Sequence, residues 1–139
     1  MQTVSSVMTA VPVTLPEGEK LTEAARAMRD NAIGTIMVVR DGRLRGVVTD
    51  RDIVIRGLAD GRDVDELTVG DVCSGDPVTV RPGDEIGVAI RLMRDRAVRR
   101  VPVVENGHPV GLVSIGDLAV GQDSEVPALG EICAAPPNS

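Results

Sequence analysis

The sequence predicts a mixed α/β (α+β) protein of two tandem β-α-β-β-α units, packed sheet to sheet with pseudo-two-fold symmetry. The first observation is an internal repeat: shifted by 65 positions, so that Val13 falls on Val78, the sequence aligns on itself without a gap from about residue 4 to 52. The second is that both copies show the same order of apolar patterns and turn residues. The third is size, because a lone unit of about 50–60 residues would bury too little apolar surface to be stable.

Each copy opens with a short strand behind a proline, expected at 13–15 and at 78–80. A helix follows, in which apolar residues recur at the i, i+3, i+4, i+7 spacing of a half-buried helix. The residues with this spacing are Leu21, Ala24, Ala25 and Met28 in the first copy and Ile86, Ala89, Ile90 and Met93 in the second.

A hairpin comes next in each copy, because turn dipeptides that tolerate positive φ separate two apolar runs. The runs 36–40 and 43–48 flank Asp41-Gly42, and the runs 101–105 and 109–113 flank Asn106-Gly107-His108. A second helix is expected to begin at Thr49 and at Ser114.

The repeat predicts four segments: a first unit over 1–60, a linker over 61–67, a second unit over 68–122 and a C-terminal tail over 123–139. The second helix of the first unit carries Ile53, Val54, Ile55 and Leu58, and is therefore apolar on more than one face. Such a helix is either deeply buried or contacts another subunit. We therefore expect a homodimer.

Composition excludes several classes of function. The formal net charge of −6 argues against a nucleic-acid or anionic-membrane binder, and with no Phe, Trp or Tyr the chain cannot stack bases on aromatic rings. No run approaches the roughly 18–20 apolar residues of a membrane span, and no signal-peptide pattern is present. We expect a cytoplasmic protein.

Metal and catalytic sites are not expected. The two cysteines, Cys73 and Cys133, have no metal-type spacing, and we expect no disulfide between them. His108 is the only histidine and falls in a predicted turn. Without a nucleophile–base pair or a His/Cys cluster, the sequence does not predict an enzyme.

The strongest candidate site is a four-residue pattern that occurs twice, as Thr49-Asp50-Arg51-Asp52 and as Ser114-Ile115-Gly116-Asp117. A hydroxyl and a carboxylate three residues apart at a strand-to-helix junction form a variant of the helix capping box, with Asp in place of Glu. The same carboxylate is a bidentate acceptor for a vicinal diol. The two interpretations are compatible and both stay open.

These residues together resemble a CBS-domain pair, the tandem module named after cystathionine β-synthase. The resemblance covers about residues 4 to 120. It rests on the duplicated pattern, on Gly-x-x-Thr/Ser-x-x-Asp and on Arg100-Val101-Pro102-Val103. The chain is similar to small stand-alone bacterial members, including the hypoxic-response type, which Thr49-Asp50-Arg51-Asp52-Ile53-Val54-Ile55 and Ile132-Cys133 indicate.

The resemblance implies a regulatory module that binds an adenosyl ligand in the clefts between its two units and dimerises. AMP, ADP, ATP and S-adenosylmethionine are the candidate ligands, and no cofactor is required. The implied contacts are ribose hydroxyls for Asp52 and Asp117, ribose or phosphate for Thr49 and Ser114, and phosphate for Arg99 and Arg100 before Pro102, with Arg51 beside the first carboxylate.

Departures from the repeat make the two clefts unequal. The first copy has Gly34-Thr35-Ile36-Met37 where the second has Arg99-Arg100-Val101-Pro102, so the basic pair is missing from the first copy. The arginines could equally be exposed surface residues. The alternative function is therefore a ligand-free interaction or stress-response protein with purely structural clefts.

Overall fold

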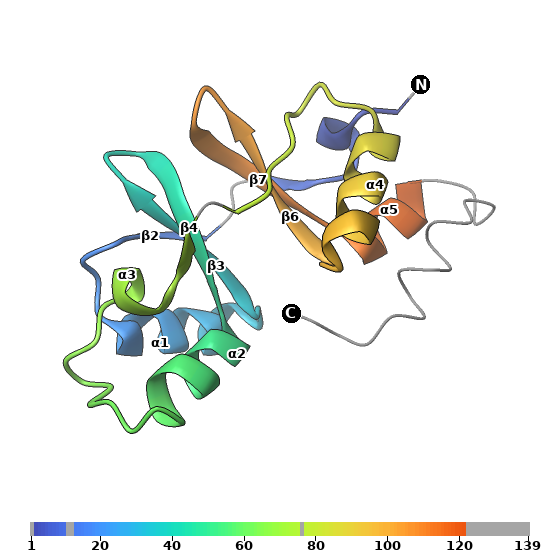
Figure 1. Cartoon of the computed structure of the whole chain (residues 1–139). Coiled ribbons are helices and arrows are strands. Elements are labelled where there is room, and N and C mark those ends of the chain that lie inside the picture. The colour runs from blue at the N-terminus through green and yellow to red at the C-terminus, as the bar shows by residue number, and fades with distance from the viewer. Residues whose placement is uncertain (1, 11–12, 76, 122–139) are drawn as a thin grey trace. The chain divides into compact units, whose positions relative to one another are not determined.

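The computed structural model describes residues 2–10, 13–75 and 77–121 (Figure 1). It divides into two compact units. The first unit is Pro12–Pro77, and the second unit combines Met1–Val11 with Val78–Ser139. None of the helices in the described part of the chain is long and apolar enough to cross a membrane.

The first unit holds a four-stranded sheet in the order β2-β3-β4-β5. Its strands are β2 (Thr14–Pro16), β3 (Thr35–Arg40), β4 (Arg43–Thr49) and β5 (Ser74–Gly75), of which only the β2–β3 pair is parallel. Its helices are α1 (Leu21–Asn31), α2 (Asp50–Asp52), which continues into the π-helix η2 (Ile53–Leu58), and α3 (Val69–Val72). Side chains of α1 and α3 pack with Ile36, Val38 and Val48 into one apolar core.

The second unit holds a three-stranded sheet in the order β1-β7-β6. The strands are β1 (Thr9–Ala10), β6 (Arg100–Glu105) and β7 (His108–Ser114), all antiparallel to their neighbours. The helices are the 3₁₀ turn η1 (Val4–Ser6), α4 (Ile86–Arg96) and α5 (Ile115–Gly121). The core joins Val4, the apolar face of α4, Leu118 and the inward-facing valines of β6 and β7.

The predicted mixed α/β class, the two amphipathic helices and both hairpins are confirmed. Each hairpin turn has two residues with positive φ, Asp41 (53°) and Gly42 (78°) in the first unit and Asn106 (53°) and Gly107 (84°) in the second. These are the dihedrals that the Asp-Gly and Asn-Gly dipeptides were expected to supply. The expected sheet-to-sheet packing of the units stays a prediction.

Three local predictions are wrong. Residues 78–80 form no strand, because only Val80 bridges to Val103. His108 is not a turn residue but the first residue of β7, paired with Glu105. Ala25 is exposed, since the core-facing stripe of α1 runs through Leu21, Ala24 and Met28 instead.

The compact units group the segments differently from the repeat, whose predicted boundaries stay a prediction. We call the segment that opens each copy of the repeat its lead: residues 4–10 are the first lead and residues 69–75 the second lead. The first lead belongs to the second unit, and the second lead belongs to the first unit. Val4 and Val69 occupy equivalent places in the repeat, and both are 0% exposed in their respective cores. Each lead therefore completes the core that is formed mainly by the other copy.

The two leads are bound by matching backbone hydrogen bonds. Val4 N donates to Asp84 O at 2.8 Å, and Val69 N donates to Glu19 O at 2.9 Å. The expected linker also takes part, because Leu67 is buried and its carbonyl accepts from Leu21 N at 2.9 Å. Periodicity cannot reveal which copy a lead joins, since both copies offer the same backbone partners.

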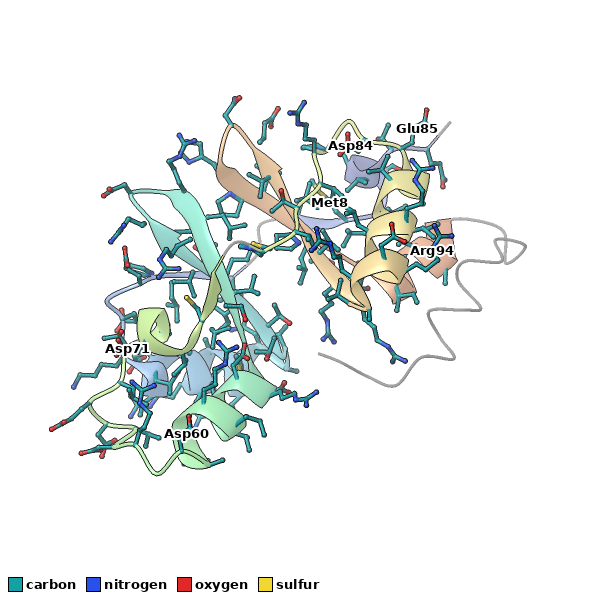
Figure 2. All side chains as sticks on the ribbon, viewed as in Figure 1. Met8, Asp60, Asp71, Asp84, Glu85 and Arg94 are labelled. Carbon is teal, nitrogen blue, oxygen red and sulfur yellow. The ribbon has the colours of Figure 1, made fainter. Side chains whose placement is uncertain are left out.

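A glycine permits each lead to reach its sheet. A side chain at Gly46 of β4 would overlap the carbonyl oxygen of Ser74 in β5. A side chain at Gly111 of β7 would lie 2.9 Å from the carbonyl oxygen of Thr9 in β1 and would also meet Met8, labelled in Figure 2. The glycine that opens each Gly-x-x-Thr/Ser-x-x-Asp motif is therefore required by the close approach of an edge strand.

Alanine at Gly46 should destabilise the protein, because the new methyl group can be accommodated only by displacing the backbone of β5. We expect a loss of about 1–3 kcal/mol in the free energy of unfolding, measured by denaturant titration with circular dichroism. The control is Gly18→Ala, where no atom lies within 4 Å of the added methyl group, and the change should stay within about 0.5 kcal/mol. Equal effects at the two positions would contradict the steric role of Gly46.

Candidate functional site

Both predicted junctions form complete capping boxes. In the first unit the hydroxyl of Thr49 accepts from Asp52 N at 3.1 Å, and Oδ2 of Asp52 accepts from Thr49 N at 2.9 Å. In the second unit Ser114 and Asp117 repeat the pair of bonds at 3.1 and 2.9 Å. The helix-capping interpretation of the motif is confirmed.

The boxes use one carboxylate oxygen and leave the other outside the cap. The backbone N–H of Thr49 and that of Ser114 both donate to Oδ2 of the aspartate, so Oδ1 of Asp52 and of Asp117 takes no part in these bonds. The two aspartates are half-buried. Each junction can therefore cap its helix and still present a carboxylate oxygen to a hydroxyl group of a ligand.

A third capping box shows that such a box does not by itself indicate a ligand site. Thr68 and Asp71 cap α3, with Thr68 N donating to Oδ2 of Asp71 at 2.9 Å. Asp71, labelled in Figure 2, is exposed and lies at the end of no hairpin. The hydrogen bond from the Thr68 backbone, with further help from its side chain, lowers the pKa of Asp71. The same geometry thus occurs at a place where the resemblance implies no ligand.

What sets the two hairpin junctions apart is the residue across the ladder. Thr35 of β3 pairs with Thr49, and Arg100 of β6 pairs with Ser114. Directly opposed residues in an antiparallel pair project from the same face of the sheet, with Cβ atoms about 5 Å apart. The structure therefore brings Arg100 to the box of the second unit and Thr35 to the box of the first unit.

The other predicted site residues surround these junctions. Arg99 joins the second junction through its backbone, because its carbonyl accepts from Ile115 N at 2.9 Å. Pro102 is buried on the same face of β6 as Arg100, and its carbonyl accepts from Val80 N at 3.1 Å. Arg51 lies on α2, between Asp50 and Asp52, and is exposed.

Thr35 is a polar residue that sequence reasoning did not select. It is 9% exposed, and its hydroxyl oxygen is buried without a hydrogen-bond partner. Ile36 and Val38 enter the core of the first unit, so the alternation of the strand places Thr35 on the opposite face. The one signal in the sequence was that Thr35 stands where the second copy has Arg100.

The described residues contain no group of three His, Cys, Asp or Glu side chains that could hold a metal ion. Cys73 is a half-buried free thiol whose pKa is raised by burial, against the opposing effect of Arg45. It is therefore protonated at neutral pH. Cys133 lies outside the described residues, as does the predicted tail, so the absence of a disulfide stays a prediction.

Two β-α-β-β-α units, each with a capped Gly-x-x-Thr/Ser-x-x-Asp junction at the end of its hairpin, define a tandem regulatory module. A family model described as the CBS domain matches residues 4–58 and again residues 69–121. The chain therefore belongs to the CBS-domain family and carries a CBS pair.

Three similar proteins match this chain over most of their length. The chain is 38% identical over 124 residues to the CBS domain-containing protein YhcV of Bacillus subtilis (strain 168), covering 89% of this chain and 88% of that protein. A crystal structure of Hypoxic Response Protein I with two coordinated zinc ions has a TM-score of 0.80 and 37% identity, over 87% of this chain and 99% of the other. A crystal structure of CBSX2 in complex with AMP has a TM-score of 0.75 and 24% identity, over 87% of this chain and 96% of the other. At this identity the similarity establishes a shared fold and nothing more.

The third box gives a prediction about pH. Because the pKa of Asp71 is lower in the folded protein than in the unfolded chain, its stabilisation is present above the unfolded pKa and is lost as the pH falls through the folded pKa. Asp71→Asn should therefore lower the free energy of unfolding by about 0.5 kcal/mol at pH 7. The difference from the unmodified protein should begin to shrink as the pH falls below about 4 and should vanish once the pH is below the lowered pKa of the folded state. A difference that does not shrink in urea titrations between pH 7 and pH 2.5 would contradict the electrostatic origin.

Proposed function

We propose that the chain is a regulatory module that binds an adenine nucleotide or another adenosyl ligand through its two hairpin junctions. The observation that carries the proposal is the placement of Arg100 directly across the ladder from Ser114, beside the Ser114–Asp117 box. This placement joins a cation to a carboxylate with one oxygen outside its cap, a combination that suits a phosphorylated sugar. The third box, at Thr68, has no such arrangement at a hairpin end.

The chemistry of each group fits a part of a nucleotide. A carboxylate accepts hydrogen bonds from the two hydroxyls of a ribose, and bonds to a charged group contribute about 1.5–3 kcal/mol each. The guanidinium of Arg100 presents a planar fork of donors that matches phosphate oxygens. The proposed contacts are Asp52 and Asp117 for ribose, Thr49 and Ser114 for ribose or phosphate, and Arg99, Arg100 and Pro102 for the phosphate side. Arg51 is proposed to contact the ligand beside the carboxylate of Asp52.

The fold supports this class of ligand without fixing its identity. CBSX2, whose structure shares the fold, was crystallised with AMP. AMP, ADP, ATP and S-adenosylmethionine are the ligands to test first.

The role is regulatory rather than catalytic, because the described residues offer no nucleophile beside a base: the thiol of Cys73 is protonated and His108 lies at a hairpin end.

An adenine nucleotide should bind with micromolar to millimolar affinity, about −8 to −4 kcal/mol. At a hundredfold excess over Kd the ligand would add about 2.7 kcal/mol to stability, which raises the unfolding temperature of a chain of this size by about 5–10 °C. Thermal unfolding followed by circular dichroism, with the four ligands at millimolar concentration, checks this. If no adenosyl compound raises the unfolding temperature, the proposal fails.

Three substitutions locate the contact when the same thermal unfolding measurement is repeated over a range of ligand concentrations. Asp52→Asn and Asp117→Asn keep much of the cap but remove the charged acceptor, and affinity should fall about 10- to 100-fold at whichever junction is used. Asp71→Asn is the matched control, because it changes an identical box at the third site. Arg100→Ala should weaken AMP more than adenosine, whereas the exposed Arg96→Ala should weaken neither.

A second candidate function is a ligand-free interaction protein. Two observations favour it. Both boxes are complete without a ligand, and the π-helix η2 exposes a cluster of large apolar side chains. These are Val54, Ile55 and Leu58, which are 51%, 49% and 59% exposed. We define them as the η2 patch. Another CBS protein, the CBS-CP12 protein of bloom-forming cyanobacteria, is hexameric.

We propose that the η2 patch is covered by a second copy of this chain, because three large apolar side chains grouped on one helix favour self-association over exposure to water. Ile55→Asp combined with Leu58→Asp should convert a dimer to a monomer, measured by light scattering at micromolar concentration. Thr14→Asp, at an exposed position of β2, should leave the mass unchanged. A monomeric mass for the unmodified protein would refute the dimer, and an unchanged dimeric mass for the double variant would place its interface elsewhere.

A further inference from the structure

We infer that the hydroxyl of Thr35 is a ligand contact, and that the junction beside it accepts the uncharged nucleoside part of the ligand rather than its phosphate. This inference rests on the proposed function and specifies it for the first unit. It assigns a residue that lies outside the Gly-x-x-Thr/Ser-x-x-Asp motif and outside the basic pair.

The hydroxyl of Thr35 is buried and unsatisfied. Thr35 is 9% exposed, and its Oγ1 has no hydrogen-bond partner among the described residues. Buried polar side-chain atoms are bonded in the large majority of cases, because an unpaired buried hydroxyl forfeits the hydrogen bonds that it makes with water. A valine would fill the same volume without this penalty. The retained hydroxyl is explained if a bound molecule supplies the missing partner.

The position of Thr35 places it beside the first capping box. Thr35 lies across the ladder from Thr49 and therefore projects from the same face of the sheet, with Cβ atoms about 5 Å apart. Thr49 in turn shares its capping box with Asp52, whose Oδ1 is outside the cap. A molecule bound to that oxygen of Asp52 would thus lie within a side-chain length of the Thr35 hydroxyl.

The charges around Thr35 differ from those around Arg100. Beside Thr35, Asp50 Oδ2 comes to 3.1 Å from where a Cβ at Gly34 would stand, and Asp52 adds a second carboxylate. Arg51 is the adjacent cation, and it is exposed. The second unit has the opposite balance, because the position of Thr35 is taken by Arg100 and that of Asp50 by uncharged Ile115. Two carboxylates repel phosphate, so the first junction favours hydroxyl and amine groups.

A threonine hydroxyl both donates and accepts, so it can bond either a ribose hydroxyl or a nitrogen on the edge of the base. Both groups are present in adenosine and in AMP. The inference therefore predicts that Thr35 recognises the two compounds equally, in contrast to Arg100, which is proposed to recognise only the phosphate.

The experiment is calorimetric titration of Thr35→Val with adenosine and with AMP. Valine keeps the branched shape and burial of threonine and removes only the hydroxyl. We expect about tenfold weaker binding of both compounds, the typical effect of one lost hydrogen bond. The unfolding temperature of the free protein should be unchanged or higher. Thr14→Val, the same substitution at an exposed site, should leave both affinities unaltered.

Each result that differs from the expected one contradicts a different part of the inference or of the proposed function. Unchanged binding of both compounds by the variant refutes the Thr35 contact and leaves the proposed function standing. A loss for AMP alone shows that Thr35 meets phosphate and refutes the charge argument. A lower unfolding temperature of the free variant means that the hydroxyl already has a partner in the protein. If the unmodified protein binds neither compound, the proposed function and this inference fail together.

Discussion

The close approach of a backbone edge to a glycine is the constraint on which both units depend. At Gly46 and at Gly111 the absent side chain leaves room for a two-residue strand, β5 or β1. The short helix that precedes that strand, α3 or η1, begins with a valine, Val69 or Val4, that is buried in the core. Those glycines also open the motifs that lead into the capped junctions. The packing of the leads and the position of the candidate site are therefore set by the same two residues in the sequence.

The capping boxes at the two junctions stabilise the starts of the helices that follow them. Each box satisfies backbone N–H groups at the start of a helix, as does the box at Thr68. The two junctions differ in the residue across the ladder, which is neutral and buried in one unit and cationic and exposed in the other. One local structure, used twice, thereby presents two different surfaces.

Local features of the fold could be predicted because their causes are local. The periodicity of α1, the positive φ at Asp41-Gly42 and the spacing of Thr49 and Asp52 each depend on a few neighbouring residues. Two features could not be predicted. The unit that Val4 joins is hidden because both copies present the same hydrogen-bonding edge, and the burial of Thr35 depends on tertiary packing that no short window of sequence contains.

Each lead packs in the unit that is formed mainly by the other copy, and this arrangement suggests how such a chain could arise. A molecule with only one copy of the repeat would lack the lead that the other copy supplies here, and would leave an open sheet edge at the glycine. It could close that edge by trading leads with an identical molecule, in the manner of a domain-swapped dimer. Gene duplication followed by fusion would then convert an assembly that depends on concentration into a single polypeptide. Such a history leaves the two halves free to diverge, as Thr35 and Arg100 have, while each remains indispensable to the other.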